Sequence, residues 1–353
     1  MAKYRMALIG FGGMAGWHTE NVRQKIKDIE VVGAYDIRPE ALETAKERGL
    51  KAYETLEELL SDETIDLVTV ATPNNFHKEL SIAALRAGKH VLCEKPVTMN
   101  AAELEEIMAV QKETGKIFTI HQNRRWDRDF LVAKLSKEQG LLGDVYMVES
   151  KVQGSRQSLH GWRGYAVNGG GMLYDWGVHL LDQALQMFGD EKVVSVGAHL
   201  CKVFANEVDD NNKLFLRFEK GASYEIEITT NCLINSPRWH IQGTGGTLEI
   251  NEWSGNGTLR RLKENAEMTW SDDIVYTAAG PTRTMAPRPE YTMEEVPLPK
   301  STGEWSQCYE NIVAVMDGRE ELFIKPEQAL RVMKVIDLMF VADKENRSIA
   351  CEI

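Results

Sequence analysis

In the first third of the chain, short apolar runs alternate with stretches of helical periodicity. The apolar runs predict buried strands at residues 4–9, 29–35, 65–71 and 90–93, and the last of an expected six strands at 117–121. The stretches between them predict helices at 16–27, 40–48, 56–60, 78–87 and 101–114. Continuous apolar character is typical of a parallel sheet that helices cover on both faces. The pattern therefore predicts an α/β, doubly wound unit that ends near Asn123.

Beyond that point the hydrophobic period changes from continuous to alternating. After a helix at 127–136, strands are predicted at 144–153, 193–203, 212–218, 222–230, 238–242 and 247–250. Alternation favours a large, mainly antiparallel open sheet with one buried face, and the other face is solvated or used for association. The polar stretch 253–300 carries five prolines and predicts an irregular excursion. Amphipathic helices at 305–316 and 327–342 are expected to close the fold.

The length of 353 residues exceeds what one ordinary core supports and predicts two domains, 1–123 and 124–353. Hydrophobic content of 43% and charged content of 27% are those of a soluble globular protein. A net charge of −12 argues against nucleic acid or an anionic membrane as the main partner. Five scattered cysteines favour reduced thiols, and no signal peptide or membrane-length apolar run is evident. We therefore expect a cytoplasmic protein.

A glycine turn follows the first predicted strand. The run Gly10-Phe11-Gly12-Gly13-Met14-Ala15 has the spacing of the dinucleotide fingerprint in its Ala-ending form. Gly10 permits the tight turn and Gly12 lets a pyrophosphate approach the positive N-terminus of the next helix. Such a turn is common by itself, but here a strand precedes it and a helix follows it.

An acidic residue ends the second predicted strand, where a dinucleotide-binding unit holds the ribose. Asp36 can accept both ribose hydroxyls of NAD, and its charge repels the 2′-phosphate of NADP. Arg38, two residues on, can accommodate that phosphate. NAD is therefore the expected cofactor, with NADP as the alternative.

Two further turns lie at the carboxyl ends of predicted strands, where α/β sheets bind ligands. The first is the run from Thr72 to His77, and the second is Glu94-Lys95-Pro96. A lysine held by a following proline near a nicotinamide could bond a substrate oxygen and stabilise an alkoxide. The plain alternative is an exposed loop lysine, which is the usual environment of this residue type.

The stretch 168–190 predicts an amphipathic helix after three glycines, which let backbone or ligand approach its start. Asp175 and His179 are four residues apart on its polar arc, so the carboxylate can orient the imidazole as a general acid/base. A solvated polar face is the alternative, and it is the interpretation kept for Asp182 and Gln186. The opposite, apolar arc of this helix comprises Leu173, Trp176, Leu180, Leu181, Ala184 and Phe188.

Together these motifs make the chain resemble the Gfo/Idh/MocA oxidoreductases, which include inositol dehydrogenases and glucose-fructose oxidoreductase. The matching runs are the glycine turn with His18, Ala71-Thr72-Pro73-Asn74 with His77, Glu94-Lys95-Pro96, and Gly169 to Asp175 with His179. The resemblance implies a Rossmann domain followed by an α/β domain whose open sheet often forms dimers or tetramers. It also implies Lys95, Asp175 and His179 as the catalytic set, with Glu94 beside the nicotinamide.

On this basis we assign candidate residues to two groups. The expected cofactor-binding residues are Gly10, Phe11, Gly12, Gly13, Met14, Asp36, Ile37, Arg38, Ala71, Thr72, Asn74, His77, Glu94, Lys95 and Asn123. The expected substrate-binding residues are Arg124, Trp126, Arg156, His160, Trp162, Arg163, Tyr165, Asp175 and His179. Aromatic rings stack on sugar faces and arginines bond hydroxyls or carboxylates, although Trp162 and Tyr165 could be ordinary packing and Arg163 could reach the cofactor.

The expected activity is transfer of hydride between NAD and a secondary alcohol of a sugar, sugar derivative or inositol. In that reaction His179 removes the hydroxyl proton and Lys95 steadies the oxyanion, without a metal. One alternative is a glycosidase that retains NAD and acts by oxidation and elimination. Another is a non-catalytic nucleotide sensor, although a sensor needs neither Lys95 nor His179. The expected partners are a small sugar or polyol and further copies of the chain, as a homodimer or homotetramer.

Overall fold

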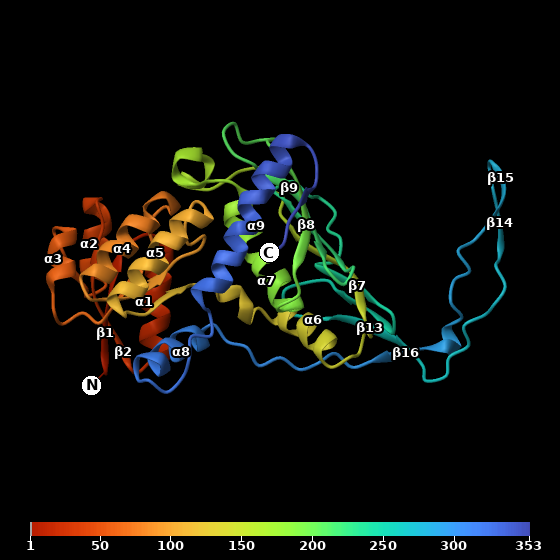
Figure 1. Ribbon diagram of the computed structural model, residues 1–353, viewed down its shortest axis with the longest axis horizontal. Helices are drawn as coiled ribbons and strands as arrows, with labels where there is room; N and C mark the ends of the chain where they lie inside the picture. Colours follow the sequence, from red (N-terminus) through yellow and green to blue (C-terminus); the bar gives the residue numbers. More distant parts are fainter. Residues whose placement is uncertain (1) are drawn as a thin grey trace.

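A six-stranded parallel sheet and a nine-stranded mixed sheet organise residues 2–353, the part of the chain that the computed structural model describes (Figure 1). Helices α6, α7 and α9 lie between the two sheets in this view. The arrangement confirms the predicted fold class, a Rossmann-type unit followed by an α/β unit with a large open sheet.

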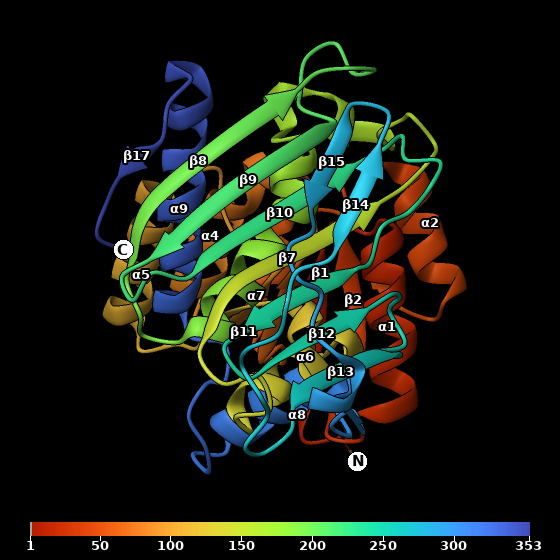
Figure 2. The same cartoon turned by 90° about the vertical axis from the view of Figure 1, so that its right-hand side faces the viewer.

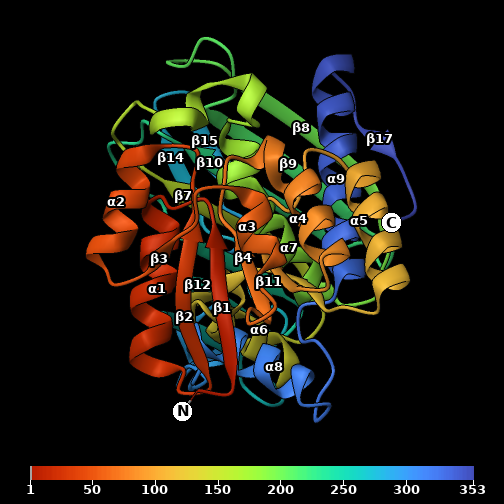
Figure 3. The ribbon, with the colours of Figure 1, turned by 90° about the vertical axis from the view of Figure 1, so that its left-hand side faces the viewer.

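The parallel sheet has the strand order β3-β2-β1-β4-β5-β6. Its strands are β1 (Tyr4–Ile9), β2 (Ile29–Tyr35), β3 (Lys51–Ala52), β4 (Leu67–Val70), β5 (His90–Cys93) and β6 (Phe118–Ile120). Its helices are α1 (Gly13–Lys25), α2 (Pro39–Glu47), α3 (Leu56–Ser61), α4 (His77–Arg86) and α5 (Ala101–Thr114). Figure 3 shows α1 and α2 on one side of β1 and β2, and α4 and α5 on the other.

Burial and capping explain why these residues form these elements. Every residue of β4 is buried, as the continuous apolar run predicted for a strand covered on both faces. Helix α3 begins where Thr55 accepts a bond from the Glu58 amide, and α5 begins where Asn100 accepts one from Glu103. Because the sheet order reverses between β1 and β4, their carboxyl ends open a crevice there.

The second sheet has the order β16-β13-β12-β11-β7-β10-β9-β8-β17, and only the β7–β10 pair is parallel among its pairings. The six predicted strands are β7 (Val145–Gln153), β8 (Val193–Cys201), β9 (Asn211–Phe218), β10 (Ser223–Thr229), β11 (Trp239–Gly243) and β12 (Gly246–Ile250). Helices α6 (Arg128–Glu138), α7 (Val178–Phe188) and α9 (Pro326–Glu345) cover one face, and Figure 2 looks onto the other. Side chains of β9 and β10 alternate between buried and more exposed, as predicted.

The stretch 253–300 is more regular than the sequence predicted. It contributes β13 (Gly257–Leu262) and β16 (Met293–Val296) to the edge of the large sheet. Between them, β14 (Ile274–Thr277) and β15 (Gly280–Arg283) form a separate hairpin that extends away from the rest of the molecule (Figure 1). These strands were missed because they have only four to six residues, so pairing with a neighbour decides their structure rather than an apolar period.

The last helices return to both sheets, as predicted for elements that close the fold. Helix α8 (Ser306–Met316) lies beside the N-terminal unit (Figure 1). Helix α9 is tied to α5 through Asp337, whose carboxylate accepts a bond from the Ala101 amide at 2.9 Å. Strand β17 (Ile349–Ala350) then pairs with β8. Within residues 2–353, none of the helices combines the length and apolar character needed to cross a bilayer.

Candidate active site

The glycine turn between β1 and α1 is shaped to receive a ligand. Gly10 has φ +85°, and a Cβ there would lie 2.7 Å from the Ala71 carbonyl oxygen, so only glycine fits. At Gly12 and Gly13 a Cβ would meet no atom within 4 Å. Helix α1 begins at Gly13 without a side-chain cap, which leaves its first amides for an anion. This cradle fits the pyrophosphate of a dinucleotide.

Asp36 lies beside the turn with its carboxylate already bonded. It accepts bonds from the Phe11 amide at 2.7 Å and from the Arg38 amide at 2.9 Å. The Arg38 guanidinium folds back onto both carboxylate oxygens at 3.1 Å. Burial opposes ionisation, but these bonds outweigh it and lower the pKa of Asp36. An ionised carboxylate and a neutralising guanidinium therefore share this end of the crevice.

Three cavities follow one another along the crevice and share wall residues. The turn cavity, about 550 Å³, is lined by Gly10, Gly12, Gly13, Asp36, Ile37, Arg38, Ala71, Thr72 and Trp162, among others. The inner cavity, about 450 Å³, is lined by Gly12, Gly13, Met14, Ala71, Thr72, Asn74, Glu94, Lys95, Asn123, Arg124, Trp162, Arg163, Asp175, Trp176 and His179. The outer cavity, about 710 Å³, shares Arg163, Asp175 and Trp176 with the inner one and adds Arg156, His160 and Trp253. Most of the predicted site residues thus come together.

Lys95 spans the crevice from the N-terminal unit to the stretch before α7. Its ammonium donates bonds to the Asp175 carbonyl oxygen at 2.7 Å and to Oδ1 of the same residue at 2.9 Å. The Arg163 Nε donates to that Oδ1 at 3.1 Å. Burial would raise the pKa of Asp175, but the two cations lower it overall. Lys95 is therefore a positioned side chain of the inner cavity, not a free loop lysine.

His179 does not bond to Asp175, which corrects the predicted pairing. Its Nδ1 lies 3.0 Å from Oε1 of Gln122, whose amide nitrogen in turn faces the Val178 carbonyl oxygen at 3.5 Å. Because Oε1 only accepts, Nδ1 carries the proton and Nε2 keeps a lone pair. Burial and the charges of Lys95 and Arg124 hold the pKa of His179 well below its usual value, so the ring is neutral at pH 7.

A π-helical turn explains the lost pairing. Residues Leu173–Gly177 form this turn, in which the Val178 amide donates to the Leu173 carbonyl oxygen five residues earlier. The regular helix α7 begins only at Val178, so the predicted spacing of 100° per residue does not hold before it. The carboxylate of Asp175 is engaged by Lys95 and Arg163 instead. Gln122 follows β6 and was not predicted as a site residue. Its position after the carboxyl end of a strand is the one feature of the sequence that could have indicated it.

The same turn brings Trp176 out of the predicted apolar arc and into the wall of the inner and outer cavities. The Arg124 guanidinium carbon lies 4.2 Å from the centre of the Trp176 ring and 5.2 Å from that of Trp253. Trp253 comes from the β12–β13 connection, within the stretch predicted to be an irregular excursion. The two ring centres are themselves 5.6 Å apart, so Arg124 lies against both indoles and not between them. We call this group the Trp176–Arg124–Trp253 cluster, and its cation–π contacts help to hold both rings in the wall of the outer cavity.

The three glycines before the π-helical turn pack closely against neighbouring protein atoms, so in the described part of the chain no open space for a ligand lies beside them. A Cβ on Gly170 would lie 2.2 Å from the Arg163 carbonyl oxygen, and one on Gly171 would lie 2.3 Å from the Asp209 carboxylate. Asp209 accepts a bond from the Leu173 amide at 2.7 Å and so satisfies the start of the turn. The glycines therefore let the segment that carries Arg163 pack directly against the segment that carries Asp175.

Four predicted ligand residues lie away from the three cavities. The ring nitrogens of His77 lie 2.8 and 2.9 Å from the carbonyl oxygens of Pro96 and Thr72, so this buried residue ties two turns together instead of contacting a cofactor. Phe11 is buried in the core, and Tyr165 is 54% exposed outside the cavity walls. Trp126 lines a different cavity, beside Phe323 and α8.

Asp182, interpreted from the sequence as part of a solvated face, is buried. Its two carboxylate oxygens accept bonds from the Arg125 guanidinium at 2.6 and 2.8 Å. The pair connects α7 to the segment that follows β6. This buried bidentate pair fixes the segment that carries Gln122 against the helix that carries His179. Sequence spacing did not reveal the pair.

Comparison with known proteins identifies the family of the chain. The model of the oxidoreductase family with an NAD-binding Rossmann fold matches residues 4–122, and that of the GFO/IDH/MocA C-terminal domain matches 130–249. An uncharacterized oxidoreductase of Schizosaccharomyces pombe is 31% identical over 99% of each chain. A scyllo-inositol 2-dehydrogenase (NADP(+)) of Bacillus subtilis is 29% identical over 84% of this chain and 82% of its own.

The solved structure of an NAD-binding protein from Listeria innocua is 40% identical, with a TM-score of 0.94 over 99% of this chain and 100% of its own. The two family models together span more than half of the sequence. The chain therefore belongs to the Gfo/Idh/MocA family of NAD-binding oxidoreductases.

Proposed function

We propose that the protein oxidises a secondary alcohol of a sugar, sugar derivative or inositol, with NAD as the preferred hydride acceptor. The observation that carries the proposal is the meeting of Lys95, His179 and the glycine turn in the wall of one cavity. The turn would hold the pyrophosphate, and the inner cavity would then take the nicotinamide and the reacting carbon. When bound, the cofactor supplies the hydride acceptor.

The protein's own residues supply the proton chemistry. A neutral imidazole with its proton fixed on Nδ1 can accept the hydroxyl proton at Nε2. The Lys95 ammonium can donate a bond to the same oxygen as negative charge develops on it. Asp175 holds that ammonium in place and balances its charge, so its proposed role is to position Lys95 rather than to orient His179.

Recognition of the substrate would extend from the inner to the outer cavity. The Trp176–Arg124–Trp253 cluster presents indole surface suited to the apolar face of a sugar ring. Arg156, His160 and Arg163 offer hydrogen-bond donors around it. The Bacillus subtilis relative is named for scyllo-inositol, which is in keeping with a ring that carries hydroxyls.

The preference for NAD rests on the ionised Asp36 carboxylate, which repels a 2′-phosphate. Arg38 neutralises part of that charge, and the Bacillus subtilis relative is named for NADP, so both cofactors belong in the test.

A reduction screen tests the proposed function directly. Inositols, aldoses and glycosides are offered with NAD or NADP, and formation of the reduced cofactor is followed by its absorbance. We expect at least one polyol or sugar to be oxidised, faster with NAD than with NADP. If glycosides are cleaved without added cofactor and without its net reduction, the protein is a hydrolytic relative instead. If a cofactor binds but no substrate of these classes reacts, the proposed substrate class is wrong.

We also propose that the protein forms a homo-oligomer through the open side of the large sheet, with the projecting hairpin as part of the contact. A two-stranded hairpin alone is marginally stable in water, and this one exposes Ile274 by 60%, Val275 by 45% and Tyr276 by 80%. Large apolar side chains also lie exposed on the sheet, including Met147 and Phe215. A second copy of the chain would cover both.

Removing the hairpin tests that contact. Leu262 and Met293 are paired in register, so a short glycine-containing turn can replace residues 264–291 without breaking the sheet. We expect the variant to have fewer subunits than the full chain by light scattering, with its cofactor affinity retained. The matched variant Tyr276→Ser should weaken association less. An oligomer that is unchanged by the deletion, or a full chain that is monomeric, contradicts the proposal.

A further inference from the structure

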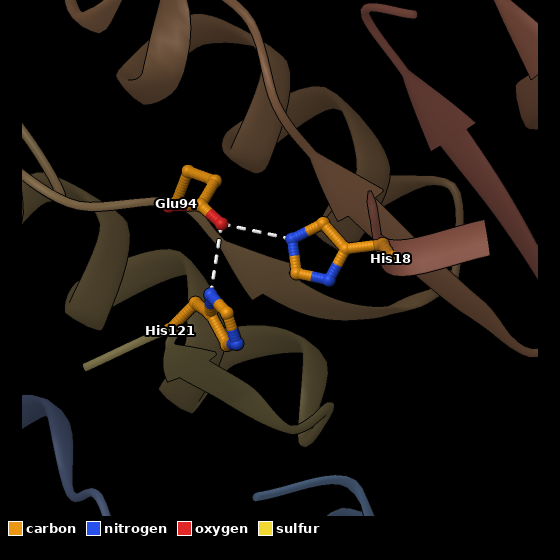
Figure 4. Close-up of side chains that lie close together, drawn as sticks. All are labelled: His18, Glu94 and His121. Carbon is orange, nitrogen blue, oxygen red and sulfur yellow. Dashed lines mark hydrogen bonds and ion pairs between the residues drawn. The ribbon is translucent and has the colours of Figure 1, made fainter. Parts of the chain in front are cut away.

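A buried cluster surrounds the Glu94 side chain at the floor of the inner cavity (Figure 4). His18 reaches it from α1, and His121 reaches it from the residue after β6. Nε2 of His18 and Nδ1 of His121 both lie 2.8 Å from the same carboxylate oxygen. The Tyr309 hydroxyl from α8 lies 2.5 Å from Nδ1 of His18. Each of these side chains is buried.

These contacts determine where the protons lie. A carboxylate oxygen accepts, so His18 donates from Nε2 and His121 donates from Nδ1. The remaining nitrogen of His18 then accepts from the Tyr309 hydroxyl. The remaining nitrogen of His121 has no hydrogen-bond partner among residues 2–353. The contacts thus require a proton on Nε2 of His18 and on Nδ1 of His121, and both bonds point to the Glu94 carboxylate as acceptor.

The geometry is that of hydrogen bonds and not of a metal site. Ligand nitrogens and oxygens around a tetrahedral zinc ion are separated by roughly 3.3 Å. Both imidazole nitrogens are closer than that to the Glu94 oxygen. The donors also explain the ionisation, because burial would raise the pKa of Glu94 but its bonds to His121 and His18 hold it well below the usual value.

Neither of the Glu94 oxygens is paired with a lysine or arginine side chain in the part of the chain that the structure describes. The second carboxylate oxygen accepts a bond from the Lys95 amide at 3.2 Å, whereas the Lys95 ammonium is bonded to Asp175. Within residues 2–353, no lysine or arginine nitrogen lies within 4.0 Å of the Glu94 carboxylate. Other titratable groups near Glu94 are His77 from α4 and His179 from α7, and burial lowers the pKa of both. The thiols of Cys93 from β5 and Cys308 from α8 also lie near it, and burial raises the pKa of both.

We propose that His18, His121 and Tyr309 keep Glu94 as a permanent anion whose charge makes the inner cavity bind oxidised, cationic nicotinamide more tightly than reduced, neutral nicotinamide. The inference rests on the proposed function, which puts the nicotinamide in this cavity. An anion that lines the same cavity would attract the positive charge of the oxidised ring, which the reduced ring lacks. The cluster would thereby set the relative affinity for the two cofactor forms.

Direct binding measurements on the purified full chain test the charge. The variant Glu94→Gln keeps one side-chain oxygen that can accept from both histidines and removes the charge, with the loss of the bond from the Lys95 amide to the second oxygen. We expect the ratio of Kd for NAD⁺ to Kd for NADH, measured by calorimetry, to rise about tenfold or more. An unchanged ratio, including equal weakening of both forms, overturns the inference while leaving the proposed function in place. Failure of the unmodified protein to bind either form instead overturns the proposed function.

The pH dependence of the same ratio tests the supporting histidines. In the unmodified protein the ratio should be constant from pH 8 to pH 6, because Glu94 stays ionised. His121→Phe removes one donor, so the pKa of Glu94 rises and the preference for NAD⁺ should weaken as the pH falls. His90→Phe is the matched control, because His90 begins β5, the strand that leads to Glu94, and accepts a bond from the Ile117 amide instead of bonding to the carboxylate. A flat profile in a folded His121→Phe protein contradicts the supporting role. If that variant does not fold, the ratio in Glu94→Gln decides.

Discussion

Replacing His179 by Ala is expected to lower kcat for alcohol oxidation about 10²- to 10⁴-fold, because the reaction then loses its proton acceptor. Binding of NAD should remain nearly unchanged, since the imidazole is not part of the glycine cradle. Steady-state kinetics and calorimetric titration with NAD measure the two effects separately.

Two matched variants identify which atom of His179 acts. In His179→Asn the amide can still donate to Gln122 but has no group at the Nε2 position, so we expect the same loss as with Ala. In Gln122→Leu the imidazole stays but loses the acceptor that fixes its tautomer, so we expect a smaller loss of kcat. Full activity of His179→Asn contradicts the assignment of Nε2 as the base.

The pH profile provides a further check on His179. Because its pKa lies well below the usual value of 6.5, kcat/KM for oxidation should stay level as the pH falls to 6.5 and decrease only at lower pH. The sign follows from the base role, since the protonated ring cannot accept the substrate proton. A decrease centred above pH 6.5 would mean that a group other than His179 accepts the substrate proton.

Replacing Lys95 by Met is the second substitution with a large expected effect. The side chain keeps its length but loses the ammonium that would bond the developing oxyanion, so kcat should fall about 10²- to 10³-fold. The affinity for NAD should change little. Lys95→Ala should behave alike, although it also leaves a space in the cavity wall.

Lys95→Met should also change the ionisation of Asp175 and the stability of the protein. That carboxylate would retain only Arg163 as a cationic partner, so burial should raise its pKa and the free energy of unfolding should decrease. Lys95→Arg keeps the charge but places a planar guanidinium where a compact ammonium fits, so its stability should exceed that of Lys95→Met while its kcat remains low. Undiminished turnover in Lys95→Met contradicts the proposed role.

Local sequence signals predicted the N-terminal unit well. The glycine turn and the apolar runs each depend on neighbouring residues, so they could be recognised without a structure. Strand β3 was not predicted because it has only two residues. In the second unit alternation predicted the central strands, but β13 and β16 depend on pairing partners and were missed.

The candidate site was predicted in part for the same reason. Lys95 and Glu94 follow a strand of a parallel sheet, so topology alone brings them to the crevice. His179 was recognised from a helix pattern, but its partner was not. The contact between His179 and Gln122 joins residues 57 positions apart, and that between Tyr309 and His18 joins residues 291 apart. No local period reports contacts of that range.

The sequence by itself determined the order of the elements, the dinucleotide cradle and the chemical types gathered at the crevice. The tertiary structure decided which of those groups touch. A π-helical turn redirected Asp175 to Lys95 and Arg163, placed Trp176 in the cavity wall and left His179 to Gln122. The physical reason is that helical spacing specifies neighbours only while the regular helix continues, whereas hydrogen bonds across the crevice depend on how the two sheets pack.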